Sequence, residues 1–194
     1  MPNARSSIGM TTLNKYIYVS GGMNASDYEF SSVLKYSPRT DTWTKVKPMN
    51  EARRGHELIS LRGFIYAIGA PGTKTVERYS PLIDEWAFVA QTNHVHIYFG
   101  ATSHQNKIYV LSENGFEVFN PEFDTWHDLP SLNFGWGSQL VSINDRLLAV
   151  GVGEGSNKGK ASKTIYEFNI TNYSWIHLPD MNAPRLYHRA VVVN

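Results

Sequence analysis

The sequence predicts an all-β protein made of four tandem repeats, each forming four antiparallel strands. A tryptophan recurs at intervals of 43, 40 and 49 residues, and each one is preceded seven residues earlier by Tyr or Phe. Two short apolar runs come before every such pair, and no stretch of the chain shows a sustained helical period. A period of tens of residues indicates an architecture in which each unit stacks on its neighbours.

Each aromatic pair encloses a polar turn between the last two strands of a repeat. The four segments are, in chain order, "YSPRTDTW" (36–43), "YSPLIDEW" (79–86), "FNPEFDTW" (119–126) and "FNITNYSW" (168–175). Asp and Asn commonly bond the backbone of their own turn. We expect this of the acidic or amide residue shortly before each tryptophan, namely Asp41, Asp84, Asp124 and Asn172.

The apolar runs supply the first two strands of each repeat. The second run of each pair is rich in Ile, Val and Tyr, which predicts strands buried on both faces. These second runs are "YIYVSGG" (16–22), "FIYAIGA" (64–70), "KIYVLSE" (107–113) and "LLAVGVG" (147–153). A two-residue polar turn suited to a hairpin separates each from an earlier run. The earlier runs are "IGMTTL" (8–13), "HELISL" (56–61), "YFGATS" (98–103) and "SQLVSI" (138–143).

Composition and charge exclude several classes of function. The 18 basic and 17 acidic residues nearly cancel, which argues against nucleic acid and anionic membranes as partners. No apolar run approaches the roughly 18 residues needed to cross a bilayer, and the start "MPNARSSIG" lacks the apolar segment of a signal peptide. We therefore expect a soluble, cytoplasmic protein. The absence of Cys excludes disulfides, thiolate metal sites and a Cys nucleophile.

The first repeat carries Arg5, the double glycine Gly21-Gly22, Tyr36 and Trp43 in that order. This pattern resembles the kelch repeat, and the resemblance extends over essentially the whole chain. It implies a kelch-type β-propeller in which each repeat is one four-stranded blade. The repeats are expected at about 2–49, 50–92, 93–133 and 134–182, and residues 183–194 match the Arg, His and first strand of a fifth blade.

Later repeats depart from the pattern at the glycine pair. Ala70 replaces the second glycine of the second repeat, Ser112-Glu113 stands in the third and Gly151-Val152 in the fourth. Kelch propellers are usually rings of about six blades, so four repeats and a remnant are expected to be part of a longer ring. The open sheet edges of an incomplete ring would favour self-association.

The resemblance also separates structural residues from candidate binding residues. The Trp and the Tyr or Phe of each repeat are expected to pack between adjacent blades as core. The paired glycines are expected where the backbone turns sharply or approaches another segment closely, because a side chain there would be costly.

Kelch propellers of the ubiquitin-ligase adaptor type hold their substrates with two sets of loops. By resemblance, the loops between second and third strands are 23–32, 70–74, 112–115 and 153–162, and the loops between blades are 47–55, 90–98, 130–137 and 179–187. Family members often read acidic peptides with Arg and polar residues that begin the first strand. The positions that match are Arg5, Arg53, His96, Gly135 and Arg185.

A binding and a structural role are both open for Arg53 and Arg185, because the Arg belongs to the repeat pattern itself. Arg54 lies outside the pattern and is expected to be free to meet a ligand. Exposed aromatic rings provide contact area at low entropic cost. The aromatic residues in or beside these loops are Tyr28, Tyr98, Trp136 and Tyr187.

Signs of catalysis are weak. The segment "HVH" (94–96) places two imidazoles on one side of a strand, which suits a metal ion. His104 lies in the same repeat, but no clear third ligand is evident nearby. The segment "GEGSNKGKAS" (153–162) differs from a phosphate loop in its spacing and in having Ala161 after Lys160. Copper oxidases built on kelch propellers use a Cys, which this chain lacks. We therefore expect no catalytic residue, metal or cofactor.

The function predicted from this resemblance is protein interaction. The favoured role is substrate recruitment in a BTB-kelch adaptor, which meets a cullin-based ubiquitin ligase through a BTB domain outside this chain. The alternative is a cytoskeletal scaffold associated with actin, and a kelch-fold enzyme is the third class. The partner is expected to be a protein or peptide with an acidic or phosphorylated loop.

Overall fold

The computed structural model describes residues 1–2, 4–132, 137–151, 160–186 and 188–190. These residues form four antiparallel sheets of four strands each and no helix, which confirms the predicted all-β class. None of them belongs to a helix long and apolar enough to cross a bilayer. The chain divides into two compact units, Met1–Ile97 and Tyr98–Asn194.

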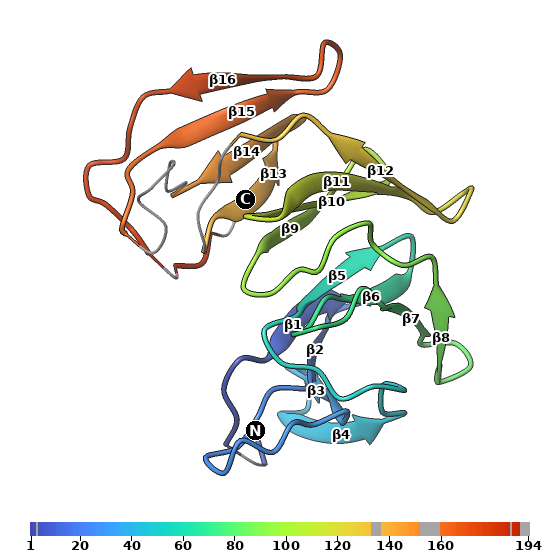
Figure 1. Cartoon of the computed structure of the whole chain (residues 1–194). Helices are drawn as coiled ribbons and strands as arrows, with labels where there is room; N and C mark the ends of the chain where they lie inside the picture. The colour runs from blue at the N-terminus through green and yellow to red at the C-terminus, as the bar shows by residue number, and fades with distance from the viewer. Residues whose placement is uncertain (3, 133–136, 152–159, 187, 191–194) are drawn as a thin grey trace. The chain divides into compact units, whose positions relative to one another are not determined.

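The first unit contains two sheets whose strands follow one another in chain order (Figure 1). One sheet consists of β1 (Gly9–Leu13), β2 (Tyr16–Ser20), β3 (Val33–Ser37) and β4 (Thr42–Val46). The other consists of β5 (Glu57–Leu61), β6 (Phe64–Ile68), β7 (Val76–Ser80) and β8 (Glu85–Val89). Strands β1 and β5 of the two sheets lie in contact, so the first strand of one repeat packs on the first strand of the next.

The second unit repeats this arrangement with two further sheets (Figure 1). The third sheet consists of β9 (Gly100–His104), β10 (Lys107–Ser112), β11 (Gly115–Asn120) and β12 (Thr125–Leu129). The fourth consists of β13 (Gln139–Ile143), β14 (Arg146–Val150), β15 (Ile165–Asn169) and β16 (Ser174–Leu178). Strands β9 and β13 are in contact, as β1 and β5 are in the first unit.

The recurring aromatic pair is a directly opposed pair of residues on the last two strands. In the first two repeats Tyr36 faces Trp43 and Tyr79 faces Trp86, with ring centroids 4.9 and 5.0 Å apart. Phe119 and Phe168 face their tryptophans in the same way, at 5.1 and 4.9 Å. Aromatic pairs of this kind stabilise neighbouring strands. The turn prediction is therefore confirmed in all four repeats.

The cores of the two units lie between the adjacent sheets of each unit. In the first unit Tyr18, Leu58 and Ile65 pack with Tyr79 and Trp86. In the second unit the cluster gathers Tyr109, Phe116, Val118, Leu140 and Phe168. The second strands supply much of this buried surface, as their Ile, Val and Tyr content predicted.

The tryptophans differ in burial, although all were expected to be core. Trp86 is 8% exposed and Trp126 7%, whereas Trp43 and Trp175 are only half-buried. Trp86 donates its indole N–H to the carbonyl of Lys47, 2.9 Å away, just after the last strand of the preceding repeat. Trp175 donates to the carbonyl of Pro130 in the same way, at 2.8 Å. The indole N–H is thus a link between neighbouring repeats.

The expectation that an Asp or Asn bonds its own turn backbone is wrong for two of the residues named. Asp41 Oδ1 accepts a hydrogen bond from the hydroxyl of Tyr36, at 2.7 Å. Asp84 Oδ1 accepts from the hydroxyl of Tyr79, at 2.7 Å, and from the backbone N–H of Lys47, at 2.9 Å. A carboxylate that begins a strand can therefore join its own aromatic residue to the preceding repeat.

In the fourth repeat the residue named, Asn172, lies three residues before its tryptophan, whereas each Asp of the other repeats lies two residues before its own. Asp41, Asp84 and Asp124 all have a φ of 51°, and the residue with the matching conformation is Tyr173, at 56°. Asn172 instead accepts a hydrogen bond from the hydroxyl of Ser174, at 2.6 Å. The position equivalent to Asp84 is thus Tyr173, and the choice of Asn172 was wrong.

The double glycine of the first repeat lies where two repeats meet. Gly21 has a φ of 60°, and a Cβ there would clash with the backbone carbonyl of Arg53. Gly22 has a φ of 83° and donates its N–H to that same carbonyl, at 2.8 Å. Both reasons for expecting glycine, the left-handed backbone and the close approach, are confirmed here.

The end of the chain leaves the fifth-blade prediction open. Arg185 forms an isolated bridge with Ser162, and residues 188–190 are not in a strand. Residues 191–194 lie outside the described residues. A first strand of a fifth blade and closure into a six-bladed ring therefore stay predictions.

Candidate partner-binding loops

Three predicted site residues share a backbone role. The carbonyl of Arg53 accepts from the N–H of Gly22 at 2.8 Å, that of His96 from Ala70 at 3.1 Å, and that of Arg185 from Ser162 at 2.9 Å. In each case the donor belongs to the loop between the second and third strands of the preceding repeat. The residue that begins a repeat is thus tied to the loop of the repeat before it.

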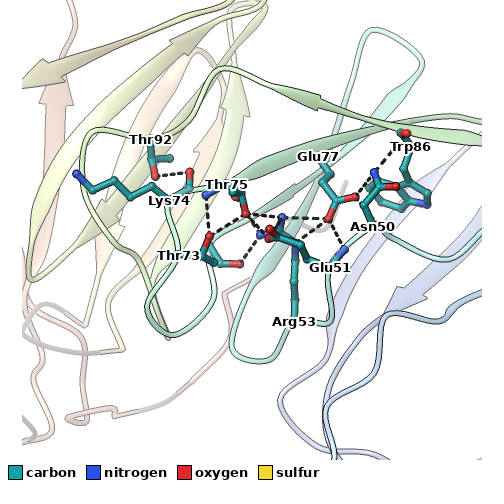
Figure 2. Close-up of polar contacts among 10 residues, drawn as sticks. Asn50, Glu51, Arg53, Thr73, Lys74, Thr75, Glu77, Trp86 and Thr92 are labelled. Atoms are coloured by element: carbon teal, nitrogen blue, oxygen red, sulfur yellow. Dashed lines mark hydrogen bonds and ion pairs between the residues drawn. The ribbon is translucent and has the colours of Figure 1, made fainter.

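The side chain of Arg53 is fully buried inside its own repeat (Figure 2). Its Nε and Nη2 donate to Glu77 Oε1 at 3.2 and 3.0 Å, and its Nη1 donates to the carbonyls of Gly69 and Thr75 at 3.0 and 2.9 Å. A buried charge is tolerated only when it is paired and hydrogen-bonded, as here. The guanidinium therefore holds the loop 70–74 and faces no solvent.

Glu77 organises the connection between the first two repeats, and sequence reasoning missed it. Its Oε2 accepts from the backbone and side-chain N–H groups of Asn50 at 2.6 and 2.8 Å, and its Oε1 accepts from the backbone of Glu51 at 3.1 Å. Figure 2 shows these groups converging on the carboxylate beside Trp86. A glutamate directly after Val76 in the strand "VERYS", where the first repeat has Leu34, was the available signal.

Arg5 holds the corresponding loop of the first repeat, but its hydrogen-bond acceptors are uncharged. Its Nη1 donates to the carbonyl of Gly21 at 3.0 Å, and its Nη2 donates to the hydroxyl of Ser32 at 3.1 Å. The guanidinium carbon lies 4.5 Å from the centroid of the Phe30 ring. Burial lowers the pKa of Arg5 from its ordinary value. Leu34 occupies the position of Glu77, so the carboxylate partner is absent.

Arg54 is paired, contrary to the expectation that it is free. Its Nε lies 2.8 Å from Glu29 Oε1, and both side chains are 34% exposed. Its Nη1 lies 3.4 Å from the sulfur of Met23. The loop 23–32 thus supplies an acidic residue to the arginine of the next repeat, and an acidic partner would have to compete with Glu29.

Tyr28 is presented to solvent by an ordered loop. The ring is 65% exposed, and its edge contacts Phe30 with centroids 5.4 Å apart. Asn24 Oδ1 accepts from the backbone N–H groups of Ser26 and Tyr28, both at 3.0 Å, which closes the turn beneath the ring. The loop 23–32 thus contains both an exposed ring, Tyr28, and the carboxylate that pairs with Arg54, Glu29.

The other predicted binding residues differ in how far their side chains are exposed. His96 is fully buried, so its side chain faces no solvent in the first unit. Tyr98 begins the second unit with a φ of 51° and is 43% exposed. Arg185 is exposed. Trp136 and Tyr187, with Gly135, lie outside the described residues.

Metal and phosphate sites gain no support. The rings of His94 and His96 lie edge to face with centroids 6.4 Å apart. Within the part of the chain that the structure describes, no three His, Cys, Asp or Glu residues gather as metal ligands. Most of the segment 153–162 lies outside the described residues.

His56 shows how far polar groups are buried between repeats. Its Nε2 lies 2.7 Å from the hydroxyl of Ser20 in the preceding repeat, and a Cβ at Gly9 or Gly21 would clash with its ring. Burial first, and then the charge of Arg53, lowers the pKa of His56 to about 3. The imidazole is therefore a neutral packing group and not a titrating site residue.

Comparison with known proteins agrees with this architecture. Residues 4–50 match the kelch motif. The chain is 29% identical to mouse (Mus musculus) kelch-like protein 36 over 163 residues, 71% of this chain and 26% of the relative. It is 30% identical to human (Homo sapiens) kelch-like protein 11 over 126 residues, 59% of this chain and 18% of the relative. It is 27% identical to mouse kelch-like protein 35 over 194 residues, 93% of this chain and 32% of the relative.

These matches and the four sheets support a kelch-repeat domain that resembles the domain of kelch-like proteins. Its four-stranded sheets are consistent with blades of a kelch-type β-propeller. The chain spans about a quarter of the length of kelch-like protein 36, at 26%, and the greater part of that relative has no counterpart here.

Proposed function

We propose that this domain binds a protein partner through the loop 23–32 and the adjoining connection 47–55. The observation that carries the proposal is Tyr28, a 65% exposed ring held on a hydrogen-bonded turn in the same loop as the ion-paired Glu29. Large rings on ordered loops contribute contact area without losing much conformational freedom. An exposed hydrophobic residue is not by itself evidence of a binding site. Tyr28 is singled out because its turn is closed by hydrogen bonds from two backbone N–H groups to Asn24.

The ion pair between Arg54 and Glu29 sets the charge of this surface. Both groups are partly exposed, so an acidic residue of the partner can take the guanidinium of Arg54 while Glu29 turns to solvent. Exposed ion pairs are individually weak, so this exchange costs little. An acidic or phosphorylated partner loop stays the proposed ligand, with Tyr28 as the anchor and Arg54 as the charged contact.

The predicted set of partner-binding residues is narrowed accordingly. Arg5, Arg53 and His96 are proposed to act through the loops that they hold in place, because their polar groups are occupied or buried. Tyr98, Trp136, Arg185 and Tyr187 remain proposed contacts on the second unit. Self-association of an incomplete ring is a separate proposal.

At the level of the whole protein, we propose substrate recruitment for a cullin-based ubiquitin ligase in a BTB-kelch adaptor of the cytoplasm. Support comes from the similarity to kelch-like proteins. An actin-associated scaffold is the alternative, and no catalytic role is proposed. Co-purification of the whole protein with a cullin favours the first role, and co-sedimentation with filaments favours the second.

The binding surface is tested by comparing what the domain captures with and without its exposed residues. Tyr28→Ala and Arg54→Ala are each immobilised beside matched controls, Phe123→Ala and Arg39→Ala, which remove exposed residues from turns between third and fourth strands. Proteins retained by the parent and both controls but lost from both loop variants are partners of this surface. Equal retention by all five proteins would rule it out.

A further inference from the structure

The second unit contains a cavity of about 500 Å³ between its two sheets, close to the turn that joins β15 and β16. Its lining includes Lys107, Tyr109 and Val118 from the third repeat and Phe168 and Tyr173 from the fourth. Small-molecule sites usually have volumes of about 300–1,000 Å³. The cavity lies away from the loops between second and third strands, so the proposed partner surface does not explain it.

In the first unit a hydrogen-bonded link crosses the equivalent position, and a hollow of about 600 Å³ lined by Tyr16, Lys35 and Thr44 is present on the first sheet. The hydroxyl of Tyr79 and the backbone N–H of Lys47 both donate to Asp84 Oδ1, at 2.7 and 2.9 Å. The ring of Tyr18 lies against Tyr79 with centroids 6.0 Å apart. A carboxylate thus fills the gap between the last strand of one repeat and the outer strands of the next.

In the second unit every member of this link is replaced. Register and turn conformation place Phe168 at the position of Tyr79 and Tyr173 at that of Asp84. Pro130 takes the position of Lys47, because the carbonyl of each accepts the indole N–H of the following tryptophan. Phe lacks the hydroxyl, Tyr173 lacks the carboxylate and Pro lacks the N–H.

The second unit therefore lacks the hydrogen-bonded link, but its two repeats still pack on each other. The bond from Trp175 to Pro130 is present at 2.8 Å, and Phe116 packs edge to face on Phe168 with centroids 4.8 Å apart. One further pair of residues differs between the units. Lys35 covers the Tyr16 ring in the first unit at 3.9 Å, and the corresponding residues of the second unit are Val118 and Lys107.

The walls combine an apolar interior with hydrogen-bond donors on one face. Tyr109, Val118 and His127 are directly opposed along β10, β11 and β12, and Lys107 lies two residues before Tyr109 on the same face. Lys107 and His127 are exposed at the mouth, whereas Tyr109 is 5% exposed inside. Asp128 borders the cavity from the alternate position of β12, whose side chains point to the other face.

Tyr109 has an unused donor at this site. The structure contains no hydrogen bond from its hydroxyl to any described residue, although its ring contacts His104 and Phe116. Burial raises the pKa of Tyr109, so the hydroxyl keeps its proton and can donate it. The hydroxyl can therefore donate to an acceptor bound in the cavity.

We propose that this cavity binds a small, flat, apolar molecule that carries a carboxylate. Its ring system lies between Val118 and Phe168, and its carboxylate accepts hydrogen bonds from the hydroxyl of Tyr109 and the ammonium group of Lys107. The ammonium group of Lys107 and the hydroxyl of Tyr109 favour a carboxylate over a neutral group of the same shape.

Calorimetric titration of residues 1–194 with naphthalene-2-carboxylate and with naphthalene-2-carboxamide tests the proposal. The acid is expected to bind about tenfold more tightly than the amide, because a charge-assisted hydrogen bond is stronger than a neutral one. Lys107→Gln should abolish this preference, and Lys15→Gln, an exposed lysine of the β1–β2 turn, should leave it unchanged. Tyr109→Phe should weaken the acid several-fold without lowering the thermal midpoint.

A second variant separates loss of the cavity from loss of the fold. Pro130→Lys, Phe168→Tyr and Tyr173→Asp together transplant the link of the first unit into the second. This triple variant is expected to bind neither probe while its thermal midpoint stays the same or rises. No binding of either probe by the parent at millimolar concentration, equal affinity for acid and amide, or undiminished binding by a folded triple variant would each overturn the proposal.

Discussion

The first and second repeats contain the same aromatic hairpin but use it differently. Their Tyr–Trp pairs have centroid distances of 4.9 and 5.0 Å, and in both the Tyr hydroxyl lies 2.7 Å from the Asp of the turn. The second hairpin also contacts the first repeat, through the indole of Trp86 and the carboxylate of Asp84. The motif therefore shapes the hairpin locally, and docking on a neighbour is a separate property.

The two arginines that begin these repeats, Arg5 and Arg53, also differ in the partners that they bind. Arg5 donates to a carbonyl and a hydroxyl, whereas Arg53 also pairs with the fully buried carboxylate of Glu77. One sequence pattern thus yields a partly exposed loop clamp in the first repeat and a buried ion pair in the second.

Breaking the buried ion pair is expected to have the largest effect on stability. Arg53→Met should lower the free energy of unfolding of the first unit by about 3–5 kcal/mol, because it leaves Glu77 charged and buried. Arg5→Met should cost only about 1 kcal/mol, since the lost hydrogen bonds are partly exposed and go to uncharged acceptors, and no carboxylate is left unpaired. Urea unfolding followed by the NMR signals of the first unit measures both.

A double variant is the control for this difference. Arg53→Met combined with Glu77→Gln removes the second charge as well, and part of the lost stability should return. Equal losses for Arg5→Met and Arg53→Met would show that the ion pair does not distinguish the two repeats.

Truncation of the tryptophans should separate hairpin formation from docking. Trp86→Ala is expected to cost about 3–5 kcal/mol, as for other buried aromatic side chains. The sequence predicts that Trp43 is core as well, but that residue is half-buried, so Trp43→Ala is expected to cost only about 1–2 kcal/mol. Urea unfolding midpoints of the two variants, measured side by side, check this ranking.

Trp86→Phe isolates the hydrogen bond to Lys47 because it keeps most of the ring. It should cost clearly less than Trp86→Ala and more than Trp43→Phe. If the Trp43 and Trp86 substitutions proved equivalent, docking on the preceding repeat would contribute nothing measurable.

The sequence predicted the fold well because the evidence for it is local and periodic. The opposition of Tyr36 and Trp43 follows from a spacing of seven residues, and the need for glycine at Gly21 follows from its place in the repeat. The site was predicted less well because it depends on contacts between repeats. Nothing in the neighbourhood of Arg54 indicates that Glu29, 25 residues earlier, neutralises it.

The same reason explains why the cavity of the second unit escaped prediction. Phe168, Tyr173 and Pro130 are each unremarkable in sequence, and only the hydrogen-bonded link of the first unit reveals what they lack together. Comparison of repeats within one structure supplied the missing information.

Gly21→Ala should have an intermediate effect, about 3 kcal/mol, because it combines a left-handed backbone with a clash against the carbonyl of Arg53. Gly63→Ala is the matched control. Gly63 has a φ of 82°, but no atom lies within 4 Å of the added Cβ, so only about 1 kcal/mol should be lost. Thermal midpoints would contradict this account if the two variants melted together.

The smallest expected effect is a pH dependence of the link at Asp84. The hydrogen bond from the backbone of Lys47, and then that from Tyr79, lowers the pKa of Asp84. A carboxylate whose pKa is lower in the folded state adds stability above its unfolded pKa and loses it as the pH falls through the folded value. Asp84→Asn should therefore be less stable than the parent by about 1 kcal/mol or less at neutral pH, and the difference should shrink as the pH falls below about 4. Urea midpoints measured from pH 7 to pH 2.5 test this, with Asp41→Asn as the companion that lacks the bond to a preceding repeat. A gap between parent and Asp84→Asn that stayed constant over this range would mean that the carboxylate charge does not strengthen the link, and the contrast between the two repeats would then rest on Trp86 and Arg53 alone.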